Sequence, residues 1–342
     1  MRSEEFSAAT ARRRLVLTCI LLWCAVANFS LFTFRFSLLS SIRAQSLTLV
    51  ELNCENLFDC SHDPGKDDYE FLADGDRHWS RTKYWRKLNN VGQEILSCAD
   101  VLPDLVALCE VENDTVLHDL TRRSLLRGAG YHYLMTESPD VRGIDVALLY
   151  RPNRFQPVCY ECIAVEPLPE MRPTRDILYV RGRMSESGDT LHVFVVHAPS
   201  RYGGEKETRP FRRLVSQRLS EAVAQLKGEK VMVMGDFNDY HNDASLRHLE
   251  RVAGLTNITK RAVGTHGTKG NYRHEGLWRN LDHVLLSPEL LPFVDSVYIN
   301  DAPFLLEEDA RYGGFKPRRT FVGFRYQRGF SDHLPLVVRF KL

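Results

Sequence analysis

The sequence predicts a layered α/β sandwich. Apolar segments of strand length recur from residue 47 to the last residue, and amphipathic helical segments lie between them. These strands are too numerous for a simple doubly wound sheet. No repeat, low-complexity segment or Pro/Gly-rich linker divides residues 46–342, so we expect one domain over this range.

Six apolar runs have the length of buried strands. They cover residues 47–52, 105–108, 146–150, 191–196, 231–234 and 334–340, the last of which closes the chain. Helical periodicity predicts one helix from about Pro210 to Leu226, with Thr208 as its N-cap and Gly228 as its stop. Two further helices are predicted over residues 82–96 and 116–126.

The first 45 residues have the layout of an export signal. Arg12, Arg13 and Arg14 precede an uncharged run over residues 15–34, about as long as a membrane span of roughly 20 residues. Residues 1–45 are therefore predicted to be a signal peptide, cleaved near Ala44, or an N-terminal membrane anchor. We expect a periplasmic or secreted protein, or one held at the membrane by this segment.

The charge of the chain is unevenly distributed. The first 45 residues hold six arginines and two acidic residues, which leaves 39 basic and 42 acidic residues in the remainder, a net charge of −3. A slightly acidic domain argues against broad, sequence-independent adhesion to nucleic acid, although it leaves room for a local basic patch.

Polar residues with catalytic potential follow or precede the predicted strands. They form five clusters, at Asn53–Glu55–Asn56, Glu110, His197–Ser200, Gly235–Asn238, and Asp282 together with Ser331–His333. Each has a structural explanation by itself: a solvated acid, a buried histidine with a satisfied ring, a turn or a loop cap. Strand ends on a rigid scaffold present side chains into a cleft, and together these clusters supply what one reaction needs.

That reaction is hydrolysis of a phosphate ester. A hard cation such as Mg²⁺ prefers oxygen ligands, and Glu110 is the candidate for its main ligand, with Asn53 and Asp332 assisting. The attacking water needs a base, and a histidine has a suitable pKa. His333 is the candidate base and Asp282 its carboxylate partner.

Three other residues are candidates for handling the phosphate and the water. His197 and Asn238 can donate hydrogen bonds to phosphate oxygens as negative charge builds on them. Asp236 can orient the nucleophile or bind the metal.

In their order along the chain, these motifs resemble the endonuclease/exonuclease/phosphatase superfamily, which has a deoxyribonuclease I-like fold. The motifs are Asn-x-Glu at 53–55, Glu110, His-x-Pro-Ser at 197–200, Gly-Asp-Phe-Asn at 235–238, Leu-Asp-His at 281–283 and Ser-Asp-His at 331–333. The resemblance implies a four-layer sandwich, in which two mixed β-sheets pack face to face with helices on the outside. It also implies a Mg²⁺ or Mn²⁺ site around Glu110 and the pairing of His333 with Asp282.

A closer resemblance is to exported bacterial members described as endonuclease-like. It lies in residues 53–59, 142–150 and 197–204. His197 resembles the histidine of the deoxyribonuclease and sphingomyelinase branches, which disfavours a role in abasic-site repair. These matches support the fold and the chemistry and say little about the substrate.

Basic residues near the motifs are candidate phosphate contacts. Residues 311–328 mix arginines, Arg319 among them, with aromatic residues, a composition that binds phosphates and stacks on bases or that forms a solvated loop with an aromatic anchor. Arg201, Arg209 and Arg142 are further candidates with the same two interpretations.

The sequence thus predicts a divalent-metal-dependent phosphoesterase. The leading hypothesis is a monomeric, exported endonuclease or phosphodiesterase that hydrolyses nucleic acid. The alternative is a phosphatase or phospholipase-type hydrolase of small phosphoesters or lipid head groups. A catalytically inactive binding protein is a remote alternative, because none of the candidate residues is missing.

Overall fold

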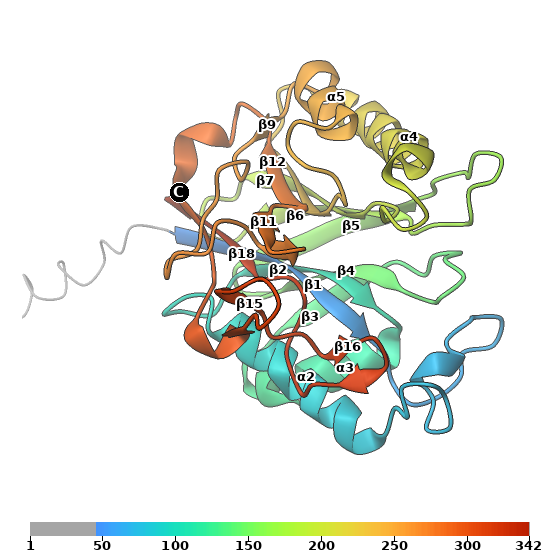
Figure 1. Cartoon of the computed structure of the whole chain (residues 1–342). Coiled ribbons are helices and arrows are strands. Elements are labelled where there is room, and N and C mark those ends of the chain that lie inside the picture. The colour runs from blue at the N-terminus through green and yellow to red at the C-terminus, as the bar shows by residue number, and fades with distance from the viewer. Residues whose placement is uncertain (1–45, 342) are drawn as a thin grey trace, which may run out of the picture. The chain divides into compact units, whose positions relative to one another are not determined.

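The computed structural model describes residues 46–341, which belong to one compact unit. Two six-stranded mixed sheets pack face to face and helices lie outside them, so the predicted sandwich is confirmed (Figure 1). The predicted signal peptide or anchor lies outside the described residues. Between residues 46 and 341, none of the helices combines the length and the apolarity that a bilayer crossing requires.

The first sheet has the strand order β13-β18-β1-β2-β4-β3. Its central pair, β1 and β2, is parallel, and β18 lies antiparallel on the other side of β1. In the same order the strands span Val294–Ile299, Leu336–Lys341, Ser46–Leu57, Leu105–Val111, Asp145–Tyr150 and His132–Met135.

The second sheet has the order β5-β6-β7-β8-β12-β9. Here β7 and β8 are parallel, and β12 lies antiparallel beside β8. The strands span Phe155–Ile163, Ile177–Met184, Thr190–His197, Val231–Asp236, Asp282–Leu286 and Thr256–Asn257. All six strands predicted from apolar runs are present in these two sheets.

The main core lies between the two sheets. Alternate residues of each strand face inward, such as Leu47 and Leu49 on β1 and Val193 and Val195 on β7, and all four are buried. Each such side chain contributes about 1.5–3 kcal/mol by leaving water. This alternation also decides which polar residues at the strand ends point between the sheets.

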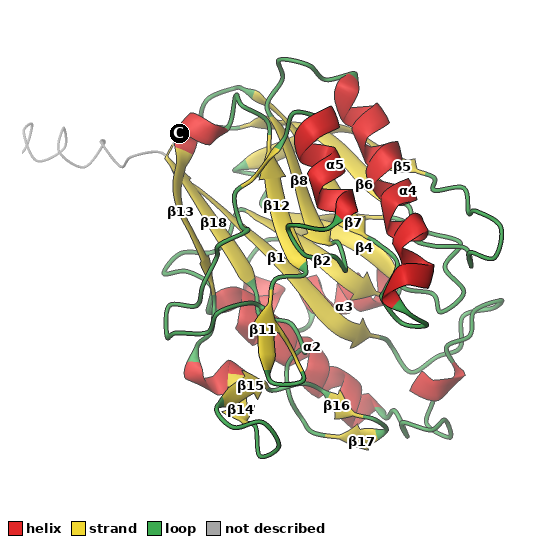
Figure 2. Cartoon of the chain, turned by 45° about the horizontal axis from the view of Figure 1, so that its top comes forward, coloured by secondary structure: helices red, strands yellow, loops and turns green. Residues whose placement is uncertain are grey.

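Helices cover the outer faces of both sheets (Figure 2). On the first sheet these are α2 (Arg81–Leu96) and α3 (Asp114–Arg122), and on the second α4 (Glu205–Ala224) and α5 (Ala244–Val252). Short 3-10 helices span Tyr69–Phe71, Leu125–Gly128, Leu291–Phe293 and Pro303–Leu305. Three small hairpins complete the fold: β10 (Tyr272–His274) with β11 (Leu277–Arg279), β14 (Leu306–Glu308) with β15 (Phe315–Pro317), and β16 (Phe321–Val322) with β17 (Arg325–Tyr326).

Helix α4 begins earlier than its sequence pattern predicts. It starts at Glu205, so Pro210 lies inside the helix and Thr208 is not its N-cap. The hydroxyl of Thr208 instead donates to the carbonyl of Gly204, at 2.7 Å. A proline removes one N–H donor from a helix, and acidic residues in the first turn, here Glu205 and Glu207, offset this by complementing the helix dipole.

One buried acid in α2 makes folding sensitive to pH. Glu94 is fully buried, and neither of its carboxyl oxygens has a hydrogen-bond partner among the described residues. Burial raises the pKa of Glu94 from 4.5 to about 8. The folded state therefore binds the proton of the Glu94 carboxyl more tightly than the unfolded state does. The free energy of unfolding consequently falls as the pH rises from about 4.5 towards 8.

We expect Glu94→Leu to stabilise the protein more at pH 8 than at pH 5, by on the order of 1 kcal/mol or more, since one pKa unit corresponds to about 1.4 kcal/mol. Urea denaturation of both proteins at several pH values gives this difference directly. Glu94→Gln is the control, because it removes the proton equilibrium and keeps a polar group. A stability gain that does not change with pH would refute the assignment to Glu94.

Candidate active site

Three predicted site residues form a row across the second sheet. In the strand register His197 on β7 pairs with Asp236 on β8, and Asp236 pairs with Asp282 on β12. Neighbouring strands are about 4.8 Å apart, and all three side chains are buried. Gly235 allows this approach, because it has a φ of 141° and a Cβ there would lie 1.8 Å from the carbonyl oxygen of Val196.

The first sheet brings two further residues to this row. Asn53 on β1 pairs with Cys109 on β2, and Glu110 is the next residue along β2. The side-chain amide of Asn53 donates to Asp236 Oδ2 at 3.1 Å and so links the two sheets. Glu110 accepts a hydrogen bond from the backbone N–H of Asn56, at 2.8 Å.

The backbone is strained at these strand ends. Glu55, Asn56, Glu110 and Asn238 have φ values of 51°, 59°, 61° and 49°, in the left-handed region that non-glycine residues rarely occupy. Such strain persists where the surrounding structure enforces it, and it tends to cluster at functional sites. Both sheets concentrate it at the same edge of the sandwich.

His333 and Asp282 form the predicted pair. His333 Nδ1 lies 2.7 Å from Asp282 Oδ2, and Asn271 donates to the same carboxylate oxygen. Burial alone would lower the pKa of His333, but the nearby carboxylates of Asp282, Asp236 and Asp332 raise it well above its usual range. The pair is therefore suited to stabilise an imidazolium.

The pKa of His197 is shifted in the opposite direction to that of His333. Burial lowers its pKa well below the usual range, and the charges of Arg175 and Arg142 lower it further. Its Nε2 lies 3.8 Å from Glu110 and 3.7 Å from Asp236, and no described residue hydrogen-bonds its Nδ1. A neutral imidazole of this kind can donate one hydrogen bond without carrying a charge.

Asp236 lies at the centre of the group. Its two oxygens accept from the backbone N–H of Asn238 at 2.8 Å and from the Asn238 amide at 3.2 Å, and the same amide also donates to the carbonyl of Ala198. Burial, reinforced by the negative charge of Asp282, raises the pKa of Asp236 to about 7. Asn238 thus contacts both carboxylate oxygens of Asp236.

Asp332 and Arg319 are paired with each other. Arg319 donates to Asp332 and to Glu55, both at 3.0 Å. Burial opposes ionisation of Asp332, but the charge of Arg319 lowers the pKa of this carboxyl. The structure therefore places Arg319 next to a predicted metal ligand, and its contact with substrate phosphate remains a prediction.

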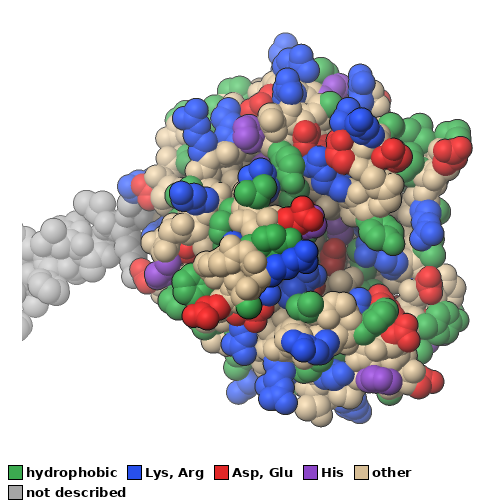
Figure 3. Space-filling model, in the orientation of Figure 1, with side chains coloured by type: hydrophobic (Ala, Val, Ile, Leu, Met, Phe, Trp, Pro, Cys, Tyr) green, Lys and Arg blue, Asp and Glu red, His purple; other side chains and the backbone are tan. Residues whose placement is uncertain are grey.

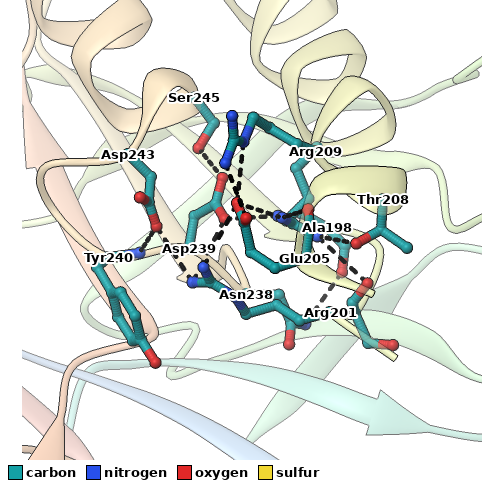
Figure 4. Close-up of polar contacts among 12 residues, drawn as sticks. Ala198, Arg201, Glu205, Thr208, Arg209, Asn238, Asp239, Tyr240, Asp243 and Ser245 are labelled. Carbon is teal, nitrogen blue, oxygen red and sulfur yellow. Dashed lines mark hydrogen bonds and ion pairs between the residues drawn. The ribbon is translucent and has the colours of Figure 1, made fainter. Parts of the chain in front are cut away.

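Arg201 and Arg209 are bound to acidic residues (Figure 4). Arg209 forms two hydrogen bonds with Glu205, at 2.9 and 2.8 Å. Arg201 pairs with Asp243 at 3.1 Å, and its guanidinium lies over the ring of Tyr240. Within the described residues, no hydrogen bond or ion pair joins either arginine to the row of His197, Asp236 and Asp282, so their predicted substrate role stays a prediction.

The sequence did not reveal three residues of the site. Glu51 is fully buried on β1 beneath Asn53, with one carboxyl oxygen unpartnered among the described residues. It was detectable as the one charged residue inside the apolar run 47–52. Arg175, which donates to the carbonyls of His197 and Ala198, and Asn271 carry no local sequence signal.

The acidic groups of the site fit a divalent cation. Asp236, Asp282 and His333 offer potential ligand atoms within 4.8 Å of one another. This set differs from the predicted ligands Glu110, Asn53 and Asp332, and two of its members, His333 and Asp282, are already hydrogen-bonded to each other. Glu51 and Asp282 each keep a buried oxygen without a partner in the described chain. Buried carboxylates need protons or a cation, and oxygen ligands suit a hard ion such as Mg²⁺ or Mn²⁺. Figure 3 shows acidic, histidine and basic side chains close together near the middle of this face.

The carboxylates and histidines gathered at one edge of the sandwich are groups that suit metal-assisted hydrolysis. Residues 48–341 match the model of the Endonuclease/Exonuclease/phosphatase family, and the chain belongs to this family. The resemblance found in the motifs is thereby confirmed. A search of the curated proteins finds no match.

Solved structures share the fold at low sequence identity. An endonuclease/exonuclease/phosphatase family protein from Bacteroides thetaiotaomicron is 17% identical with a TM-score of 0.58, over 86% of this chain and 97% of that one. A mannosyl-6-phosphatase from the same species is also 17% identical, with a TM-score of 0.58 over 86% and 100%. The catalytic domain of human nocturnin, with bound sulfate, is 20% identical with a TM-score of 0.53 over 86% and 94%.

Proposed function

We propose that this protein is a divalent-metal-dependent phosphodiesterase whose substrate is nucleic acid. The observation that carries the proposal is the His333–Asp282 pair, held at 2.7 Å next to the buried carboxylate of Asp236. Attack of water on phosphorus requires a base that is held in a fixed orientation and a cation close to the phosphate.

Each residue of the site has a proposed task. His333 takes the proton of the attacking water, while Asp282 fixes the ring and stabilises the imidazolium that forms. Asp236, whose carboxylate is fixed by Asn53 and Asn238, orients that water. His197 and Asn238 donate to phosphate oxygens on which charge develops.

A Mg²⁺ or Mn²⁺ ion, when bound, would supply positive charge beside the phosphate oxygens. Glu110 is its proposed main ligand, with Asn53 and Asp332 assisting. All three lie at the same edge of the sandwich as the row of His197, Asp236 and Asp282.

Two observations favour nucleic acid as the substrate. The basic and aromatic segment 311–328 is joined to the site through Arg319, which contacts Glu55 and Asp332. Among the structures with this fold is TDP2 from D. rerio, 18% identical, in complex with a single-strand DNA product. The alternative is hydrolysis of a small phosphate monoester, because a mannosyl-6-phosphatase is also among the structures with this fold. The arginine cluster and apolar run of residues 1–45 lead us to infer that the enzyme acts outside the cytoplasm.

We expect the purified protein to nick supercoiled plasmid or cleave RNA with Mg²⁺ or Mn²⁺, and to lose at least about 100-fold of this activity in EDTA. Chromogenic phosphate diester and monoester substrates, assayed in parallel, identify the bond that is cleaved. Cleavage of the monoester alone would transfer the proposal to a phosphatase. No cleavage by a folded, metal-loaded protein would refute it.

A further inference from the structure

The loop between β3 and β4 is held unusually firmly. The buried carboxylate of Asp145 accepts hydrogen bonds from the hydroxyl of Thr136 at 2.6 Å and from the N–H of Ser138 at 2.9 Å. From another part of the chain, Lys66 donates to the carbonyls of Ser138 at 2.7 Å and of Asp140 at 3.0 Å. A satisfied buried polar network of this kind fixes a single loop conformation.

Arg175 fastens this loop to the strand end that carries His197. Its guanidinium pairs with Asp140 at 2.9 Å and donates to the carbonyls of His197 at 3.2 Å and Ala198 at 2.7 Å. The side chain of Arg175 is only 6% exposed, and these contacts occupy its donors on three sides. Arg175 therefore acts as a clamp between the loop and the catalytic edge.

What the clamped loop presents to solvent is a second arginine. Asp140 and Gly143 close a turn around Arg142, whose own N–H donates to Asp140 Oδ1 at 2.9 Å. The Arg142 side chain is 46% exposed, and its guanidinium stays 3.8 Å from Asp140, beyond hydrogen-bond distance. No other carboxylate among the described residues pairs with it.

Backbone contacts set the position of Arg142 next to the catalytic edge. Its N–H is held by one carboxylate oxygen of Asp140, and the other oxygen pairs with Arg175, which donates to the carbonyl of His197. The scissile phosphate already has its proposed partners in His197, Asn238 and the cation. An exposed guanidinium near them, whose nearest carboxylate stays 3.8 Å away, matches an anion that is a different part of the substrate.

We propose that Arg142 is a second anion subsite, which binds the phosphate that flanks the scissile one in a nucleic-acid strand. The inference rests on the proposed function and narrows its substrate class. The enzyme would favour substrates with two phosphate groups on one nucleoside over esters with a single phosphate.

Equilibrium binding tests the subsite without requiring hydrolysis. The probes are deoxythymidine 3′,5′-bisphosphate and the two deoxythymidine monophosphates, titrated calorimetrically into the full-length protein with Ca²⁺ in place of Mg²⁺. We expect the bisphosphate to bind about tenfold tighter than either monophosphate, as one charge-assisted contact provides. Arg142→Ala should reduce this preference to about one, Arg142→Lys should keep part of it, and added salt should weaken it.

Arg251→Ala on α5 is the matched control, and its preference should equal that of the wild type. Equal affinities of the wild type for all three probes, no binding of the bisphosphate, or an unchanged preference in Arg142→Ala would each overturn the subsite. The outcome is separable from the proposed function. Hydrolysis of diesters without a preference for the bisphosphate would refute only the subsite. A preference for the bisphosphate without any hydrolysis would refute only the proposed function.

Discussion

His333→Ala is expected to lower kcat for phosphodiester hydrolysis by about 10²- to 10⁴-fold, the range that general base catalysis supplies. The ring is fixed through Nδ1 on Asp282 at 2.7 Å, which leaves Nε2 to receive the proton. Asp282→Asn keeps the shape but removes the charge that stabilises the imidazolium, so its loss should be of a similar order. Steady-state kinetics at saturating metal measure both variants.

The control for this prediction is His248→Ala, a half-buried histidine of α5 on the outer face of the second sheet. It should retain wild-type kcat. If His333→Ala keeps more than about a tenth of the activity, the base is a different group, and Asp236 becomes the candidate.

Arg212→Ala is expected to destabilise the protein by about 3–5 kcal/mol, because it leaves a buried carboxylate without its charge partner. The Arg212 side chain is fully buried and pairs with Asp239 at 2.5 Å. It also donates to Thr208 at 2.7 Å, and Asp239 accepts from Ser245 at 2.6 Å. Figure 4 shows the partners Thr208, Asp239 and Ser245 of this network, with Asn238 beside Asp239.

Urea denaturation measures the loss, and Arg218→Ala is the matched control. Arg218 pairs with Glu221 at 2.9 Å on the exposed side of α4, where an ion pair contributes about 0–1 kcal/mol. The double variant of Arg212 and Asp239 should regain part of the stability, since no orphaned charge remains. Equal losses in the two arginine variants would contradict a structural role for the buried pair.

Much of the site could be predicted because catalytic groups at strand ends leave a local signal. An apolar run followed by a polar cluster fixes the position of Asp236 or His197 to within a residue, and strand pairing then aligns these residues into a row. The sandwich itself follows from the number and length of such runs. Its division into two sheets came from the family resemblance and is confirmed by the strand order.

What the sequence could not supply depends on contacts between distant segments. Arg175 contacts the carbonyl of His197, 22 positions away, and Arg319 contacts Glu55, 264 positions away. Such partners depend on the tertiary fold and not on any local pattern. The predicted start of α4 is wrong for a local reason. Proline favours the first turn of a helix, but the acidic residues Glu205 and Glu207 complement the dipole of a first turn that begins before Pro210.

The pairing of β1 with β18 has a practical consequence. Ser46 and Lys341 are antiparallel neighbours, at the end of β1 opposite to Asn53. Asn53 lies seven residues from Ser46, so at about 3.3 Å per residue the two positions are roughly 23 Å apart. A fluorophore or a sensor surface coupled at Ser46 or Lys341 would leave the catalytic edge accessible to long polymers. A short linker between these two residues should likewise permit circular permutation, with new ends opened in an exposed loop.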